Sequence, residues 1–182
     1  MRISFSLVLV FYFMYSNVEG QTDTQYLLGK FNPADDSRFV RLTSEHASGG
    51  ALGAYLRRET LSSFEMLQKA ADRDGIQLKI ISATRNFDRQ KEIWENKWNG
   101  KTPVEGKDIS GMAGAEKAKL ILRYSSMPGT SRHHWGTDFD LNDLNPAYWK
   151  SGEGLKIYSW LLANASRFGF CQTLYKQARQ QS

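Results

Sequence analysis

The stretch SRHHWGTDFD, residues 131–140, holds two of the three histidines of the chain together with two aspartates. Imidazole nitrogens and carboxylate oxygens are zinc ligands, and a catalytic zinc takes three protein groups and a water. If residues 137–141 form a strand, Asp138 and Asp140 share one face of it, and Gly136 allows a turn that brings a histidine to that face. The pattern predicts a metal site but does not choose between the two aspartates or between His133 and His134. The alternative is a polar loop whose histidines and aspartates only make hydrogen bonds.

Apolar residues recur at helical spacing on both sides of this stretch. They predict helices over residues 57–73, 87–98, 111–124 and 154–167. Asn86 is placed to cap the second helix and Gly169 to end the fourth. Short strands are expected over residues 76–81, 137–141 and 170–174. Helices and strands do not alternate regularly, which predicts an α+β fold with a small antiparallel sheet flanked by helices.

The 182 residues, 41% of them hydrophobic and 24% charged, suit one globular domain. Residues 1–20 begin with a positive charge, continue with an apolar run and end at Gly20, which is typical of a secretory signal peptide. The apolar run is shorter than the roughly 20 residues that span a bilayer. We therefore expect a signal peptide over 1–20, an irregular segment over 21–54 that packs on the core, and one domain over 55–182. The protein would be exported to the periplasm, cell envelope or medium, without stable membrane insertion after cleavage.

The net charge of +5 is weak evidence for an anionic environment such as envelope polymer. The basic residues are spread along the chain without a dense run, so we do not expect nucleic-acid binding. A single cysteine, Cys171, excludes an intramolecular disulfide, and we expect its thiol to be buried, with a reactive thiol as the alternative. We expect a monomer.

The spacing S-x-H-x-x-G-x-x-x-D over residues 131–140 resembles the signature of the VanY-like D-alanyl-D-alanine metallopeptidases. Residues 82–90 are similar to the family segment S-x-x-R-x-x-x-x-Q at a strand-to-helix turn. Residues 128–131 resemble the turn before the first ligand, and residues 169–170 the turn after the last helix. The resemblance spans about residues 55–175 and implies the hedgehog-type fold of D-Ala-D-Ala metallopeptidases.

The resemblance implies roles for five residues. His133 and Asp140 match the zinc ligands. Arg85 matches the arginine that stabilises the oxyanion, a task suited to a permanently charged, rigid fork of donors. Ser131 and Gln90 match polar positions on the substrate side. The alternatives are a surface charge for Arg85, and capping or surface hydrogen bonds for the other two.

Three neighbouring residues have less specific expectations. His134 and Trp135 are expected to line the cleft. Asp138 stands where many relatives carry a small residue. It is expected either to contact the metal ligands without binding the metal itself, or to be solvated.

The family mechanism also needs a glutamate base and a third ligand, a histidine, in a C-terminal E-x-W-H-like strand. The chain has no histidine after His134 and no glutamate after Glu153. We therefore expect this last strand to be missing through truncation, with a natural two-ligand relative or an unidentified third ligand as alternatives. Among possible substitutes, His46 is expected at the surface, Cys171 in the core, and Glu153 in the first turn of a helix.

The sequence thus predicts an exported zinc metallopeptidase that hydrolyses stem peptides of peptidoglycan. It would act as a D-alanyl-D-alanine carboxypeptidase or as a cross-link endopeptidase. Without the base and the third ligand, the activity of the 182-residue chain is expected to be well below that of a complete relative. The alternative is a non-catalytic peptidoglycan-binding module of the same fold.

Overall fold

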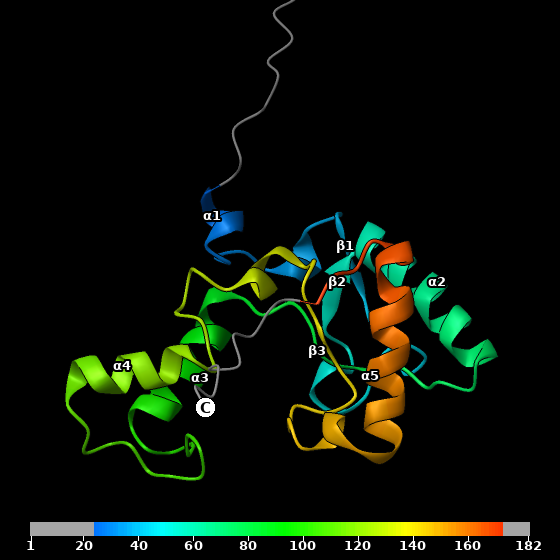
Figure 1. Ribbon diagram of the computed structural model, residues 1–182. Coiled ribbons are helices and arrows are strands. Elements are labelled where there is room, and N and C mark those ends of the chain that lie inside the picture. The colour runs from blue at the N-terminus through cyan, green and yellow to red at the C-terminus, as the bar shows by residue number, and fades with distance from the viewer. Residues whose placement is uncertain (1–23, 173–182) are drawn as a thin grey trace, which may run out of the picture.

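The computed structural model describes residues 24–172, which form helices packed around two small antiparallel sheets (Figure 1). The α-helices are α1 (Thr24–Leu27), α2 (Arg58–Arg73), α3 (Phe87–Trp98), α4 (Gly114–Leu122) and α5 (Gly152–Asn164). The strands are β1 (Phe39–Arg41), β2 (Tyr55–Arg57), β3 (Ile80–Ser82) and β4 (Asp140–Leu141). Short 3-10 helices cover Pro33–Asp35, Gly49–Ala51, Arg132–Trp135, Tyr148–Lys150 and Ala165–Phe168. The expected α+β class with small antiparallel sheets is confirmed.

Each sheet has two strands. β1 pairs with β2 through Val40 and Leu56, and β3 pairs with β4 through Ser82 and Asp140. Strand β1 lies within residues 21–54, so that segment is less irregular than expected. The β3–β4 pair matters most for the site, because it places the end of the 131–140 stretch beside the residues that precede α3.

The strands near the site are shorter than the sequence predicts. The strand expected over 76–81 begins only at Ile80, although Ile76 and Leu78 are buried as their alternation suggests. The strand expected over 137–141 is reduced to its last two residues, because only Asp140 and Leu141 pair with β3. Residues 170–172 are not in a strand, and residues 173–174 lie outside the described part of the chain.

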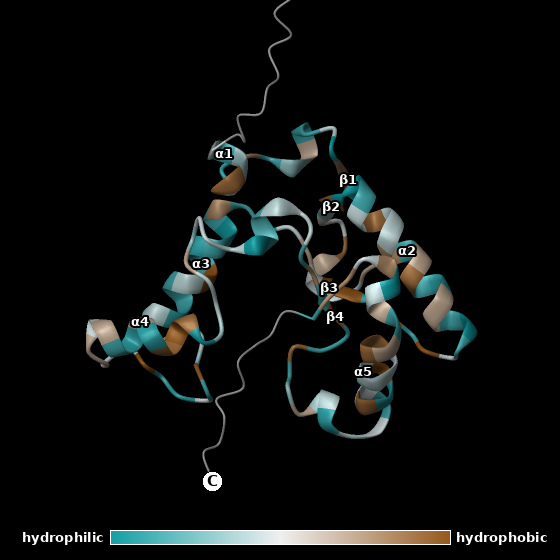
Figure 2. Ribbon diagram, turned by 45° about the horizontal axis from the view of Figure 1, so that its top comes forward, coloured by the Kyte–Doolittle hydropathy of each residue, from teal (hydrophilic) through white to brown (hydrophobic). Residues whose placement is uncertain are grey.

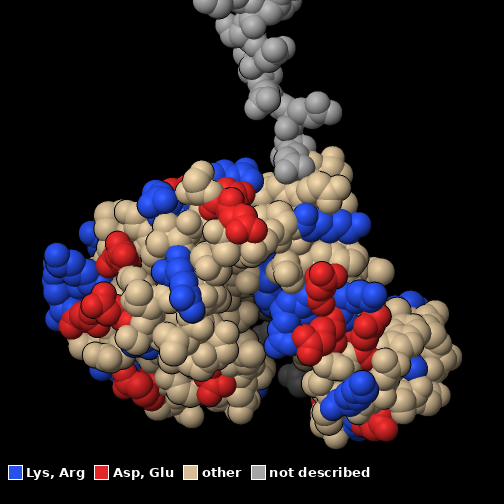
Figure 3. Space-filling view, turned by 180° about the vertical axis from the view of Figure 1, so that it is seen from behind, with Lys and Arg blue, Asp and Glu red and all other residues tan. Residues whose placement is uncertain are grey.

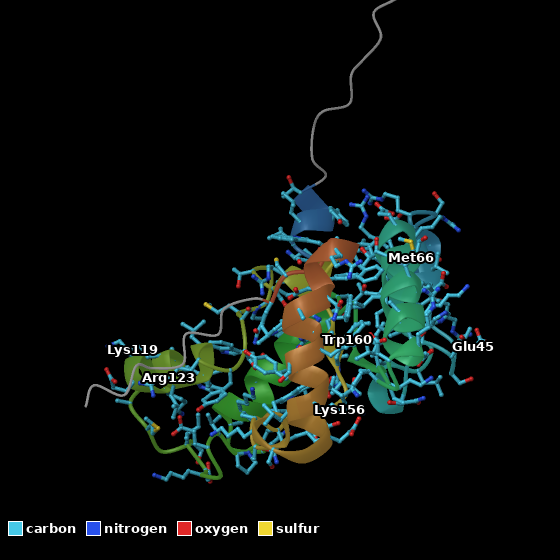
Figure 4. The ribbon with its side chains drawn as sticks, turned by 45° about the vertical axis from the view of Figure 1, so that its right-hand side comes forward. Glu45, Met66, Lys119, Arg123, Lys156 and Trp160 are labelled. Carbon is cyan, nitrogen blue, oxygen red and sulfur yellow. The ribbon has the colours of Figure 1, made fainter. Side chains whose placement is uncertain are left out.

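The main core lies between α2, α5 and the two sheets (Figure 2). Phe64 of α2 packs edge-on against Phe139, which packs in turn against Phe170, with ring centroids 5.4 and 5.2 Å apart. In α5 the buried residues are Gly154 and Ile157, whereas Leu155 and Leu162 are exposed. The indole of Trp160, labelled in Figure 4, donates to Asp74 just after the end of α2, and this bond links α5 to α2.

A second, smaller cluster lies between α3, α4 and the loop that joins them. Val104, Ile109 and Ile121 form its centre, and Trp94 and Trp98 of α3 cover it. The expected helix over 87–98 is confirmed, and the side chain of Asn86 caps it by accepting from the amide of Arg89. This cluster fixes the face of α3 that borders the site.

The surface and the helix lengths add two observations. On the face shown in Figure 3, acidic side chains lie among the basic ones. Within residues 24–172, no helix has the length and apolar character needed to cross a bilayer.

Candidate metal and substrate site

A pocket of about 350 Å³ opens between the 131–140 stretch and the segments around α3. Its lining is mostly polar. It consists of Arg85, Gln90, Tyr124, Ser125, Ser126, Thr130, Ser131, Arg132, His133, Asp138, Phe139 and Asp140. All five residues to which the resemblance assigns roles therefore border one cavity, although they come from β4, the 3-10 helix before it, the β3–α3 turn and α3.

His133 is buried and oriented with one ring nitrogen toward the pocket. Its Nδ1 lies 3.0 Å from the carbonyl of Ala83, which is an acceptor, so Nδ1 carries the proton. The Nε2 lone pair then faces the carboxylates, 3.6 Å from Oδ2 of Asp140 and 4.0 Å from Oδ2 of Asp138. Burial, and secondly the charge of Arg85, lower the pKa of His133, which keeps the ring neutral and able to act as a ligand.

This arrangement fits a zinc ion. Metal-bound histidines usually donate their other ring N–H to a carbonyl or carboxylate, as His133 does to Ala83. With zinc–ligand distances near 2.0–2.2 Å, two ligands of a tetrahedral ion lie about 3.4 Å apart. The 3.6 Å between Nε2 of His133 and Oδ2 of Asp140 is close to that value. Asp138 is farther away, and its Oδ2 also receives Nε of Arg132 at 3.4 Å.

The part of the chain that the structure describes offers only two such ligands. Within residues 24–172, no three His, Cys, Asp or Glu side chains are grouped so that they could hold a metal. His133 and Asp140 alone therefore provide two of the three protein ligands that a catalytic zinc takes.

His134 is structural, and the expectation that it lines the cleft is wrong. Its ring is fully buried, with Nε2 accepting from the amide of Gly129 at 3.1 Å and Nδ1 donating to the carbonyl of Arg85 at 2.6 Å. Both nitrogens are therefore occupied, and the ring cannot bind a metal. Trp135 does not line the pocket either, because its indole donates to the carbonyl of Leu27 and so fastens α1.

Arg85 stands at the β3–α3 turn with its guanidinium in the pocket. Its Nη2 lies 3.8 Å from Oδ2 of Asp140, and its amide donates to the carbonyl of His133 at 3.1 Å. Its side chain is only 20% exposed, which excludes the alternative of a surface charge. The geometry places a fixed cation beside the two candidate ligands.

Gln90 and Ser131 are both buried and border the same pocket, so neither makes mere surface hydrogen bonds. Nε2 of Gln90 donates to the carbonyl of Ser126 at 2.7 Å, while its Oε1 has no hydrogen-bond partner among the described residues. An unsatisfied buried amide oxygen is available to a donor on a bound molecule.

Three residues in or beside the pocket were not predicted from the sequence. Tyr124 and Ser125 line the pocket, and Lys97 stands behind Ser125 and donates to its hydroxyl at 2.5 Å. The spacing of Gln90, Trp94 and Lys97 on one face of α3 is the only sequence signal that could have found this lysine.

The other possible ligands lie apart from the pocket. His46 is buried, not at the surface as expected, because its ring contacts Thr43 and Oε1 of Glu65 at 3.1 Å. Cys171 is exposed, not buried, because Phe170 takes the inward position against Phe139. Glu153 occupies the first turn of α5, as expected.

Comparisons with known proteins agree with this geometry. The family model for VanY, D-alanyl-D-alanine carboxypeptidase, matches residues 53–182. A Bacillus subtilis (strain 168) protein named "Putative carboxypeptidase YodJ" is 30% identical over 122 residues, which are 64% of this chain and 38% of that protein.

Two solved structures are similar in fold and sequence. One is a mutant of the vancomycin-resistance D,D-pentapeptidase VanY in complex with Zn(II), with a TM-score of 0.55, 25% identity, and coverage of 74% of this chain and 65% of that one. The other is VanYB in complex with D-alanine-D-alanine, with a TM-score of 0.55, 26% identity, and coverage of 75% and 65%. The chain thus spans under two thirds of the length of these relatives.

The family match covers most of the chain, and the motif residues of the 82–90 and 131–140 stretches meet in one pocket. The chain belongs to the VanY D-alanyl-D-alanine carboxypeptidase family.

Proposed function

We propose that this protein is an exported zinc-dependent peptidase of peptidoglycan, which hydrolyses stem peptides as a D-alanyl-D-alanine carboxypeptidase or a cross-link endopeptidase. The observation that carries the proposal is the position of Nε2 of His133, 3.6 Å from Oδ2 of Asp140 and beside the guanidinium of Arg85. Zn(II) and D-alanine-D-alanine in the related structures support the choice of metal and substrate. The proposed organisation is a signal peptide over 1–20, a packed segment over 21–54 and the peptidase domain over 55–182.

His133 and Asp140 would hold the zinc. When bound, zinc supplies Lewis-acid polarisation of the scissile carbonyl and lowers the pKa of a bound water. Arg85 would stabilise the negative charge that develops on the carbonyl oxygen, because its guanidinium is held in place next to the ligands. Gln90 and Ser131 would orient the peptide, through the free amide oxygen of Gln90 and the buried hydroxyl of Ser131.

We expect slow turnover from this chain, since residues 24–172 provide two ligands rather than three. The test is release of D-alanine from a peptide that ends in D-Ala-D-Ala, with added zinc and with EDTA. Release that needs zinc and is lost in His133→Ala supports the proposal. Release that is insensitive to EDTA and to His133→Ala contradicts it.

The incomplete metal shell also favours a second candidate, a peptidoglycan-binding module without turnover. In that case peptidoglycan sedimentation would retain the protein in EDTA and in the His133→Ala variant, and no D-alanine would be released. Binding that disappears with the metal would contradict this second candidate.

A further inference from the structure

Lys97 is a half-buried cation that bonds Ser125, a residue of the pocket lining. It lies on the same face of α3 as Gln90, and the two side chains hold adjacent residues of the opposite segment. Gln90 donates to the carbonyl of Ser126 at 2.7 Å, and Nζ of Lys97 donates to Oγ of Ser125 at 2.5 Å. The 125–126 segment is therefore fixed against α3 by two hydrogen bonds.

No acidic side chain neutralises this ammonium in the part of the chain that the structure describes. No carboxylate of residues 24–172 lies within ion-pair distance of Nζ of Lys97. Burial, and secondly the positive charge of Arg85, lower its pKa, as expected for a cation close to another cation. Lys91 on the same helix is different, because it is exposed and lies 3.8 Å from Glu95. A half-buried charge without a counter-charge is a place where an anionic ligand is stabilised.

The hydrogen bond also sets the direction of the Ser125 hydroxyl. An ammonium group only donates, so Oγ of Ser125 must be the acceptor. The hydroxyl proton is then left for another acceptor, and none of the described residues accepts it. Ser125 borders the pocket, so a bound molecule can supply that acceptor.

The pocket thus has two electrically different sides. The 131–140 stretch contributes the carboxylates of Asp138 and Asp140, together with Arg132, which pairs with Asp138. The α3 side contributes the guanidinium of Arg85, the hydroxyl of Ser125 and, behind it, the ammonium of Lys97. A substrate that places its reacting carbonyl near His133 and Asp140 shares this pocket with Ser125, so its next residue can face this second side.

We propose that Lys97 is a specificity-determining residue, which orients Ser125 to bind the free terminal carboxylate of the substrate and so favours carboxypeptidase over endopeptidase action. This inference rests on the proposed function. In a cross-linked peptide the residue after the scissile bond carries an amide in place of the free carboxylate. Such a peptide lacks the negative charge that Ser125 and Lys97 would bind.

The test compares two peptides that end in D-Ala-D-Ala, one with a free carboxylate and one with a carboxamide. Binding of each is measured by calorimetry for the wild type, Lys97→Met, Lys97→Arg and Ser125→Ala. Lys91→Met is the matched control, because it removes the same charge from the same helix. We expect the wild type and Lys91→Met to prefer the carboxylate by roughly 10-fold or more, the usual effect of a charge-assisted hydrogen bond.

Lys97→Met and Ser125→Ala should lose most of this preference, and Lys97→Arg should keep it. Where turnover is measurable, Lys97→Met should raise KM for the carboxylate peptide with little change in kcat. If Lys97→Met fails to fold, the two other variants test the inference: Ser125→Ala should lose the preference for the carboxylate peptide and Lys97→Arg should keep it.

An unchanged preference in Lys97→Met and Ser125→Ala would overturn the inference and leave the proposed function standing. A wild type that binds neither peptide would overturn both.

Discussion

Nδ1 of His134 donates to the carbonyl of Arg85 across 2.6 Å, and so the second histidine of the motif positions the arginine of the pocket. Its Nε2 accepts from the amide of Gly129 in the turn before the motif. The buried ring therefore joins the β3–α3 turn to the 128–129 turn and the 3-10 helix, which lie more than 40 residues farther along the chain. This bond uses only the backbone of Arg85, and the side chain of Arg85 faces the pocket.

The first prediction concerns the pH dependence of stability. Burial lowers the pKa of His134, and of His133, below the ordinary value of about 6.5. The unfolded chain therefore takes up protons first, so stability is full above pH 6.5 and falls as the pH decreases toward the lowered folded-state values. Urea unfolding at a series of pH values from 7.5 to about 5 should show this loss. His134→Gln should show a shallower loss over the same range, and a slope equal to that of the wild type would contradict the role given to His134.

The second prediction concerns the backbone next to this ring. Gly29 has a φ of +73°, and a Cβ there would overlap the imidazole of His134. Gly75 has a φ of +67° but nothing within 4 Å of the added carbon. Both alanine variants should lose about 1 kcal/mol through backbone strain. Gly29→Ala should lose about 1–3 kcal/mol more through overpacking, as measured by urea unfolding. Equal losses would show that the ring is not packed on Gly29.

Local signals in the sequence predicted much of the fold. The spacing of apolar residues located α2 and α3 to within one residue, and Asn86 and Gly169 mark a helix start and a helix end as expected. These features depend on neighbours along the chain. The strands depend on distant partners, and so they were predicted too long: β4 comprises only Asp140 and Leu141, the residues that pair with β3, and no periodicity reveals this.

The site was predictable in composition but not in detail. Adjacent residues of the 3-10 helix point in different directions, so His133 faces the pocket while His134 faces the interior. The spacing alone could not separate the two, and only the resemblance selected His133. His46 and Cys171 were placed wrongly because each depends on a tertiary neighbour, Glu65 in one case and the inward ring of Phe170 in the other.

The third prediction concerns Arg85. Arg85→Ala keeps the carbonyl that His134 contacts, so the fold should be retained. If the guanidinium stabilises the oxyanion, kcat for D-alanine release should fall by roughly 100- to 1000-fold, with a smaller change in KM. Arg89→Ala is the control, because Arg89 is an exposed residue of α3 that pairs with Glu92. A similar effect of both substitutions on kcat would argue against a role in the reaction.

The central claim is that His133 and Asp140 bind zinc, and the most direct measurement is competitive zinc titration of the purified 182-residue chain. The wild type should bind one zinc ion. His133→Ala and Asp140→Ala should each weaken binding by more than the roughly 10- to 100-fold typical of outer-shell changes. His46→Ala should leave the affinity unchanged, because both ring nitrogens of His46 already contact Thr43 and Glu65. Zinc binding that survives both His133→Ala and Asp140→Ala, or that is lost in His46→Ala alone, would contradict the account.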